Sequence, residues 1–138
     1  MRIGRAVIIS VLLGVAACAT APAVKADAQE RVVCETTGQL GQLVSAVLAG
    51  KQPPPVQSEA LRRDLAERAS TLAAAAEQTS NAELRAGAQR AATAALAVAR
   101  ESEPPVADFN ETPEAIMVGI GEVSAECAAL GVRVKLDG

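Results

Sequence analysis

The chain has 138 residues, 13 of them basic and 16 acidic, which gives a formal net charge of −3, and it contains no histidine. An acidic surface repels phosphate backbones, and with Phe109 as the only aromatic residue there is no platform for base stacking, so we expect no nucleic-acid binding. Half of the residues are apolar, with alanine the commonest, followed by leucine and valine. This composition argues against wholesale disorder and favours closely packed helices over a sheet.

The N-terminal stretch has the pattern of a secretory leader. Arg2 and Arg5 give it a basic start, residues 6–17 form an apolar run of twelve, and residues 15–18, Val-Ala-Ala-Cys, place a cysteine directly after a small-residue processing site. The run is too short for a transmembrane helix, which needs about 20 residues. The pattern resembles the signal peptide and lipobox of a bacterial lipoprotein precursor.

That resemblance implies that residues 1–17 are removed and that Cys18 carries a lipid such as palmitate. The protein would then be held at a membrane, in the cell envelope outside the cytoplasm. Cleavage by the ordinary signal peptidase, at 17–19 or 19–21, is an alternative that would release an unlipidated, secreted protein. Loss of the leader removes two of the 13 basic residues and none of the 16 acidic ones, which leaves a mature chain with a net charge of −5.

Residues 18–28 are predicted to be a lipidated, flexible tether, because they hold a proline and small residues without apolar periodicity. Ten residues of extended chain reach at most roughly 33 Å. The domain predicted at 29–138 can therefore stand off the membrane and stay attached to it.

Four segments of this domain have apolar residues three and four positions apart, which is the period of an amphipathic helix. They cover about residues 28–49, 56–79, 80–101 and 113–130. The positions expected to face the interior are Val33, Thr37, Leu40, Val44 and Val47, then Leu61, Leu65, Ala69, Leu72, Ala76 and Thr79, then Leu84, Ala88, Ala91, Ala95 and Val98, and last Ile116, Ile120, Val123, Cys127 and Leu130.

Helix boundaries are marked by glycine, proline and capping residues. Gly50 and Gly131 provide stops for the first and fourth helices, and Thr112 followed by Pro113 is a good helix start. Ser80 and Glu83 have the spacing of a capping box for the third helix.

Two further features concern the first helix and the C-terminus. Gly38 and Gly41 each lower helix propensity by about 1 kcal/mol relative to alanine, so we expect them to mark the close approach of a neighbouring helix. Residues 132–136 form a short extended tail, either packed along the bundle or frayed.

Helices of this length joined by short loops predict an all-α fold, an up-down-up-down antiparallel four-helix bundle. In that topology the start of the first helix and the end of the fourth lie at the same end, where Cys34 and Cys127 fall. If Cys18 carries lipid, these two cysteines remain as a pair, and a disulfide between them is expected in an oxidising compartment. Two unconnected buried thiols are the alternative.

The proline-bearing loops would both lie at the opposite end of the bundle. Loops carry function more often than helix walls do, so this end is a possible interaction rim. The alternative is that the aromatic residue closes the bundle end and the prolines only break helices. The residues of the rim are Pro53, Pro54, Pro55, Pro104, Pro105 and Phe109.

The sequence predicts no enzyme, no cofactor and no metal. Without histidine there is no imidazole base, and two distant cysteines do not make a zinc ligand set. Glu122 and Glu126 share a helix face, which is more simply an exposed acidic face than an acid–base pair.

The favoured function is a lipid-anchored interaction or structural module that engages an envelope protein. The alternative is a binding protein for a small apolar ligand, held in a cavity that the alanine-rich third helix would leave open.

Overall fold

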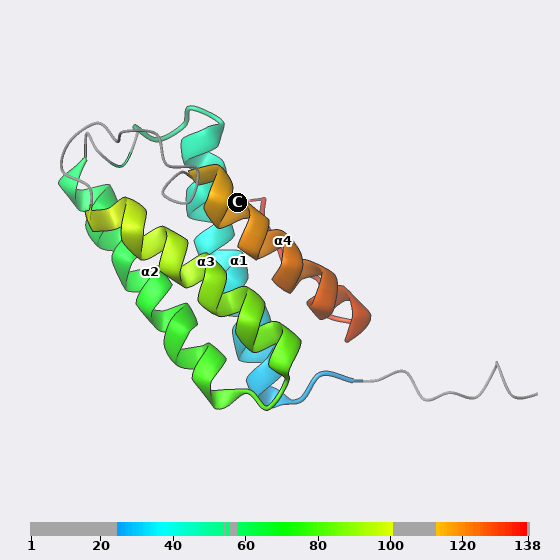
Figure 1. The fold of residues 1–138 in the computed structure, drawn as a ribbon. Helices are drawn as coiled ribbons and strands as arrows, with labels where there is room; N and C mark the ends of the chain where they lie inside the picture. The colour runs from blue at the N-terminus through cyan, green and yellow to red at the C-terminus, as the bar shows by residue number, and fades with distance from the viewer. Residues whose placement is uncertain (1–24, 54, 56–57, 101–112, 138) are drawn as a thin grey trace, which may run out of the picture.

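The structure is a computed structural model and describes residues 25–53, 55, 58–100 and 113–137. These residues form four helices that run alternately up and down, and each packs against its neighbours, with the fourth returning to the first (Figure 1). The predicted all-α, up-down-up-down bundle is confirmed. The leader, Cys18 and residues 19–24 lie outside the described residues. The helices are α1 (Ala28–Leu48), α2 (Glu59–Gln78), α3 (Ala82–Arg100) and α4 (Pro113–Ala129).

The core of the bundle is formed by the apolar stripes that the sequence predicts. Every expected interior position is buried except Val47 and Leu130, which are half-buried. The alanine-rich face of α3 brings α4 very close, since a Cβ atom added to Gly119 would lie only 2.7 Å from the backbone nitrogen of Ala91. The short side chains of α3 therefore allow direct helix-to-helix contact at this point.

Both glycine stops are confirmed, and α1 begins with a capping box. Gly50 (φ 71°) and Gly131 (φ 76°) adopt the left-handed conformation after α1 and α4, where glycine carries no steric penalty. At the start of α1, the Asp27 carboxylate accepts from the Glu30 amide at 2.8 Å, and the Glu30 carboxylate accepts from the Asp27 amide at 3.3 Å. This reciprocal capping box satisfies two amides at the helix start.

The predicted capping box of α3 at Ser80 and Glu83 is wrong by one residue. The helix starts at Ala82, and the side-chain oxygen of Asn81 accepts from the Leu84 amide at 3.1 Å. Asn81 also donates through Nδ2 to Glu30 Oε2, at 3.1 Å. This contact ties the α2–α3 turn to the start of α1.

The second helix starts three residues later than expected. Ser58 is its cap and accepts from the Leu61 amide at 3.2 Å, so the helix begins at Glu59 and not at Val56.

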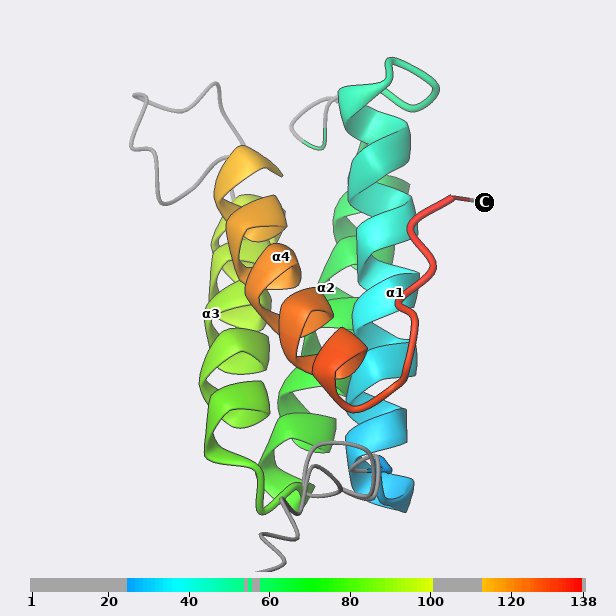
Figure 2. The same ribbon diagram turned by 90° about the vertical axis from the view of Figure 1, so that its right-hand side faces the viewer.

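The C-terminal tail, residues 132–136, packs along α1. Gly131 reverses the chain after α4, and the tail then runs beside α1 (Figure 2). Its side chains alternate between the half-buried Val132, Val134 and Leu136 and the exposed Arg133 and Lys135. This period of two is that of an extended segment with one face on the protein.

Gly38 and Gly41 accommodate this tail, so the expectation that both mark a neighbouring helix is wrong. A Cβ atom on Gly38 would lie 3.1 Å from the Lys135 carbonyl oxygen, and one on Gly41 would collide with the Leu136 side chain. Only Gly41 has a helix nearby as well, with Ile120 of α4 in ordinary contact distance. The Gln42 side-chain amide donates to the Lys135 carbonyl at 3.3 Å and fixes the middle of the tail.

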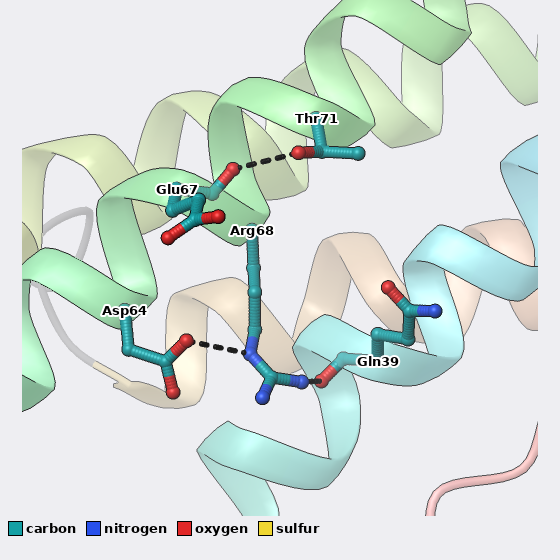
Figure 3. A network of polar contacts seen from close by, with 5 residues as sticks. All are labelled: Gln39, Asp64, Glu67, Arg68 and Thr71. Atoms are coloured by element: carbon teal, nitrogen blue, oxygen red, sulfur yellow. Dashed lines mark hydrogen bonds and ion pairs between the residues drawn. The ribbon is translucent and has the colours of Figure 1, made fainter.

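An arginine on α2 braces the opposite side of α1. Arg68 pairs with Asp64 at 3.1 Å, as the i, i+4 spacing suggests, but its guanidinium also donates to the Gln39 carbonyl at 2.9 Å (Figure 3). Arg68 therefore links α2 to α1 and is more than one half of an exposed ion pair within α2. The other i, i+4 ion pair of α2, Glu59 with Arg63, lies on the surface with its charged atoms 3.7 Å apart.

Candidate interaction surface

The disulfide predicted between Cys34 and Cys127 is confirmed. The two Cα atoms are 6.0 Å apart, the cysteines are separated by 93 positions in the chain, and both are buried. The bond therefore joins α1 to α4 at one end of the bundle, and the alternative of two unconnected thiols is excluded. Structural disulfides persist in oxidising environments, which indicates a compartment outside the cytoplasm.

The same disulfide anchors the base of the tail. The Val132 amide donates to the Cys127 carbonyl at 2.8 Å, and the Gly131 amide donates to the Ala128 carbonyl at 3.0 Å. This is the Schellman arrangement, in which the residues after a helix satisfy its last carbonyl groups. The direction in which the tail leaves α4 is set by these bonds.

A groove of about 550 Å³ lies between α1 and the tail. We call it the α1–tail groove. Its volume falls within the range of about 300–1,000 Å³ typical of binding sites. Polar and charged side chains dominate its lining, and it runs past the disulfide at Cys34. The polar and charged residues that line it are Arg31, Glu35, Gln39, Gln42, Arg133 and Lys135.

The α1–tail groove is rich in positive charge. Three cations line it, Arg31, Arg133 and Lys135, against one carboxylate, Glu35. Arg31 donates through Nε to the Ala26 carbonyl at 3.3 Å. Within the part of the chain that the structure describes, no hydrogen bond or ion pair engages the side chain of Arg133 or of Lys135. These groups are available for charge-assisted hydrogen bonds to an anionic group.

A second hollow, of about 360 Å³, lies on the α4 side of the tail. Its lining includes Ser124, Ala128 and Val134, with Arg133 as the only charged member. The tail is therefore flanked on both sides by open surface. Arg133 lines both hollows, whereas Lys135, Arg31 and Glu35 line only the α1–tail groove.

The bundle interior offers a hollow of only about 10 Å³ among the described residues. It lies between the helices near Pro55 and Pro113, and it is lined by apolar side chains such as Val44 and Ile116. A single water needs roughly 10–15 Å³ by the same measure. This hollow is therefore too small to hold a small apolar ligand.

The predicted interaction rim is only partly described. Pro53 is exposed, whereas Pro55 is buried and lines the small interior hollow. The remaining rim residues, Pro54, Pro104, Pro105 and Phe109, lie outside the described residues. The rim therefore stays a prediction.

One acidic residue of α4, Glu122, makes a contact with α3. Arg90 of α3 donates to Glu122 Oε2 through Nε at 2.8 Å and through Nη2 at 2.7 Å, so the predicted acidic face contains an ion pair between helices. The Ser124 hydroxyl donates to the Ile120 carbonyl of its own helix at 2.8 Å. No group of three or more potential metal-binding side chains occurs among the residues that the structure describes.

Sequence reasoning did not find the α1–tail groove. The signal was present in two places, the alternation of apolar and basic residues at 132–136 and the glycines at 38 and 41. Only their combination predicts that the tail lies on α1, and the two segments are more than ninety positions apart.

None of the four helices described here is both long and apolar enough to cross a lipid bilayer. No protein-family model, no curated protein and no solved structure matches the chain.

Proposed function

We propose that the protein is a lipid-anchored, non-enzymatic interaction module of the bacterial cell envelope. In this proposal residues 1–17 are a signal peptide, an acylated Cys18 holds the domain at a membrane outside the cytoplasm, and the helical bundle engages another envelope protein. The observation that carries the proposal is the Cys34–Cys127 bond. It uses both cysteines of the domain and leaves Cys18 as the odd one, directly after a small-residue processing site.

The surface supports interaction rather than ligand enclosure. The interior hollow near Pro55 and Pro113, of about 10 Å³, is too small for the small apolar ligand of the alternative function. The α1–tail groove, by contrast, is open and holds charged side chains without partners in the described part of the chain. An open, polar groove on a rigid scaffold suits recognition of another molecule's surface.

The anchor is tested by mass spectrometry of the mature protein from a bacterial membrane fraction. We expect an N-terminal Cys18 with acyl chains attached, and release of the Cys18→Ser variant from the membrane. Cys34 and Cys127 should remain joined in both proteins, which serves as the folding control. An unacylated N-terminus at Thr20 or Pro22 would overturn the lipid anchor.

The interaction itself is tested by crosslinking in intact envelopes, followed by purification and identification of the crosslinked species. We expect a defined envelope protein that crosslinks to the mature chain and not to the Cys18→Ser variant, because the variant is no longer held close to its partner. Crosslinks that contain only this chain would count against the proposal.

A further inference from the structure

The residues that line the α1–tail groove give it the length of a short extended chain. It follows α1 from Arg31 to Gln42, which corresponds to about 16 Å at 1.5 Å per helical residue, and the tail forms its other wall. An extended peptide rises about 3.3 Å per residue, so about five residues span this length. The groove fits a short linear segment better than a compact molecule.

The charges of the groove are spaced for such a segment. Arg133 and Lys135 are both exposed and alternate with the half-buried side chains of the tail, so both project from the same face. Residues two positions apart on an extended chain are roughly 6.6 Å apart. A partner segment with carboxylates at alternate positions would have the same spacing and could pair with both cations.

The groove is also held in shape before any partner arrives. The disulfide and the Val132 amide fix the base of the tail, and Gln42 holds its middle. Behind α1, Arg68 holds the Gln39 carbonyl, and the Gln39 side-chain amide points away from Arg68 (Figure 3). Because Gln39 also lines the groove, its amide can hydrogen-bond a bound backbone. A preformed site loses less entropy on binding.

We infer that the α1–tail groove binds a short, extended, acidic segment of a partner protein. The inference rests on the proposed interaction function and adds the surface and the chemistry of the partner. An anionic membrane is the less suitable occupant, because the cations line a groove on the side of the bundle. The bundle end where the tether leaves instead carries the carboxylates of Asp27 and Glu30.

The first test uses a fluorescein-labelled peptide of sequence Glu-Val-Glu-Val-Glu and the mature chain, followed by fluorescence anisotropy. We expect saturable binding that weakens with salt and is lost with the matched Gln-Val-Gln-Val-Gln peptide. The double variant Arg133→Gln/Lys135→Gln should bind about tenfold more weakly, since two exposed ion pairs together contribute on the order of 1.4 kcal/mol.

The matched control is Lys51→Gln/Arg63→Gln, which removes the same charge from two exposed residues outside the groove. Its affinity for the acidic peptide should stay within about twofold of that of the unchanged protein. Its circular dichroism spectrum should match that of the groove variant. Equal loss in both double variants would show a general charge effect and overturn the inference. So would binding of the uncharged peptide with equal affinity, or no binding of the acidic peptide.

Two further measurements separate this inference from the proposed function. If phosphatidylglycerol vesicles bind through Arg133 and Lys135 and the acidic peptide does not, the groove is a membrane contact and the inference fails. In the envelope crosslinking experiment, loss of the partner from Arg133→Gln/Lys135→Gln supports the inference. Retention of the partner overturns it and leaves the interaction function intact, whereas absence of a partner for the unchanged chain overturns both.

Discussion

Helix α4 meets its two neighbours in different ways. Along α3 the contact is closed by small residues, with Gly119 on the backbone of Ala91 and a Cβ position on Gly87 only 3.0 Å from the Val123 side chain. Along α1 the contact is closed at one end by the disulfide and along its length by the C-terminal tail. Helix α4 is thus held by close packing on one side and, on the other, by a covalent bond together with a tail that packs along α1.

The difference teaches where a binding surface can form in a small bundle. Where glycine and alanine let two helix backbones touch, the helices themselves occupy the space between them, and no channel is left. An extended segment laid on a helix surface leaves channels on both of its sides, and the hollows of about 550 and 360 Å³ lie there. The tail that completes the α1–α4 contact therefore also creates the groove.

The largest expected effect comes from breaking the covalent part of the α1–α4 contact. The disulfide closes a loop across 93 positions, and loss of such a bond costs about 2–5 kcal/mol because the unfolded chain gains freedom. We expect reduction, or the variant Cys34→Ser/Cys127→Ser, to lower the free energy of unfolding by this amount. Urea unfolding with and without reductant measures it.

The control for this experiment is Cys18→Ser, whose melting temperature should fall under reductant as much as that of the unchanged protein. Hydrogen exchange localises the effect, since amides of α1 should lose more protection than those of the α2–α3 pair. An identical melting curve with and without reductant would contradict the prediction.

The next effect comes from opening the α3–α4 contact with a single methyl group. A Cβ atom at Gly119 would lie 2.9 Å from the Ala91 Cα atom. Because the backbone of α3 cannot shift without loss of packing, Gly119→Ala should lower the free energy of unfolding by about 1–3 kcal/mol. Gly121→Ala is the matched control. A Cβ atom there has nothing within 4 Å, so the variant should gain up to about 1 kcal/mol from helix propensity.

Thermal or urea unfolding of the two variants compares them directly. Equal behaviour of Gly119→Ala and Gly121→Ala would mean that α3 and α4 are not in backbone contact.

The two contacts of α4 also differ in how far the sequence predicts them. The apolar stripes, the stops at Gly50 and Gly131, and the pairing of Cys34 with Cys127 follow from periodicity, local chain geometry and topology, and all are confirmed. The small residues of α3 suit either a cavity or a closely packed neighbour. The contact of Gly119 with the Ala91 backbone shows that the neighbour packs closely at this point.

The remaining features depend on contacts between distant segments. Asn81 replaces Ser80 as the helix cap because it also reaches Glu30 at the start of α1. The position of Gly38 in its helix predicts a contact with another helix, but the structure places the Lys135 carbonyl against it. The two residues are nearly a hundred positions apart. Local propensity carries no information about such pairs, which is why the groove could not be predicted from either segment alone.

The smallest effect, and the sharpest test of the tail, is a double-mutant cycle at Gly41 and Leu136. Gly41→Ala adds a Cβ atom that collides with the end of the Leu136 side chain, and this cost offsets the gain of about 1 kcal/mol in helix propensity. Leu136→Ala removes a half-buried side chain and should lower the free energy of unfolding by about 1 kcal/mol. When both changes are made, the collision disappears. The double variant should therefore be more stable, by about 1 kcal/mol, than the sum of the two single-variant effects predicts.

The matched cycle combines Gly38→Ala with Leu136→Ala. At Gly38 the obstacle is the Lys135 carbonyl oxygen, 3.1 Å from the added Cβ atom, and shortening Leu136 does not move a backbone atom away. We therefore expect little coupling in this cycle, measured by urea unfolding of all the variants. Equal coupling in the two cycles, or none in the first, would mean that the tail is not seated on Gly41. The α1–tail groove would then lack its second wall, and the acidic segment proposed to bind there would have no channel to occupy.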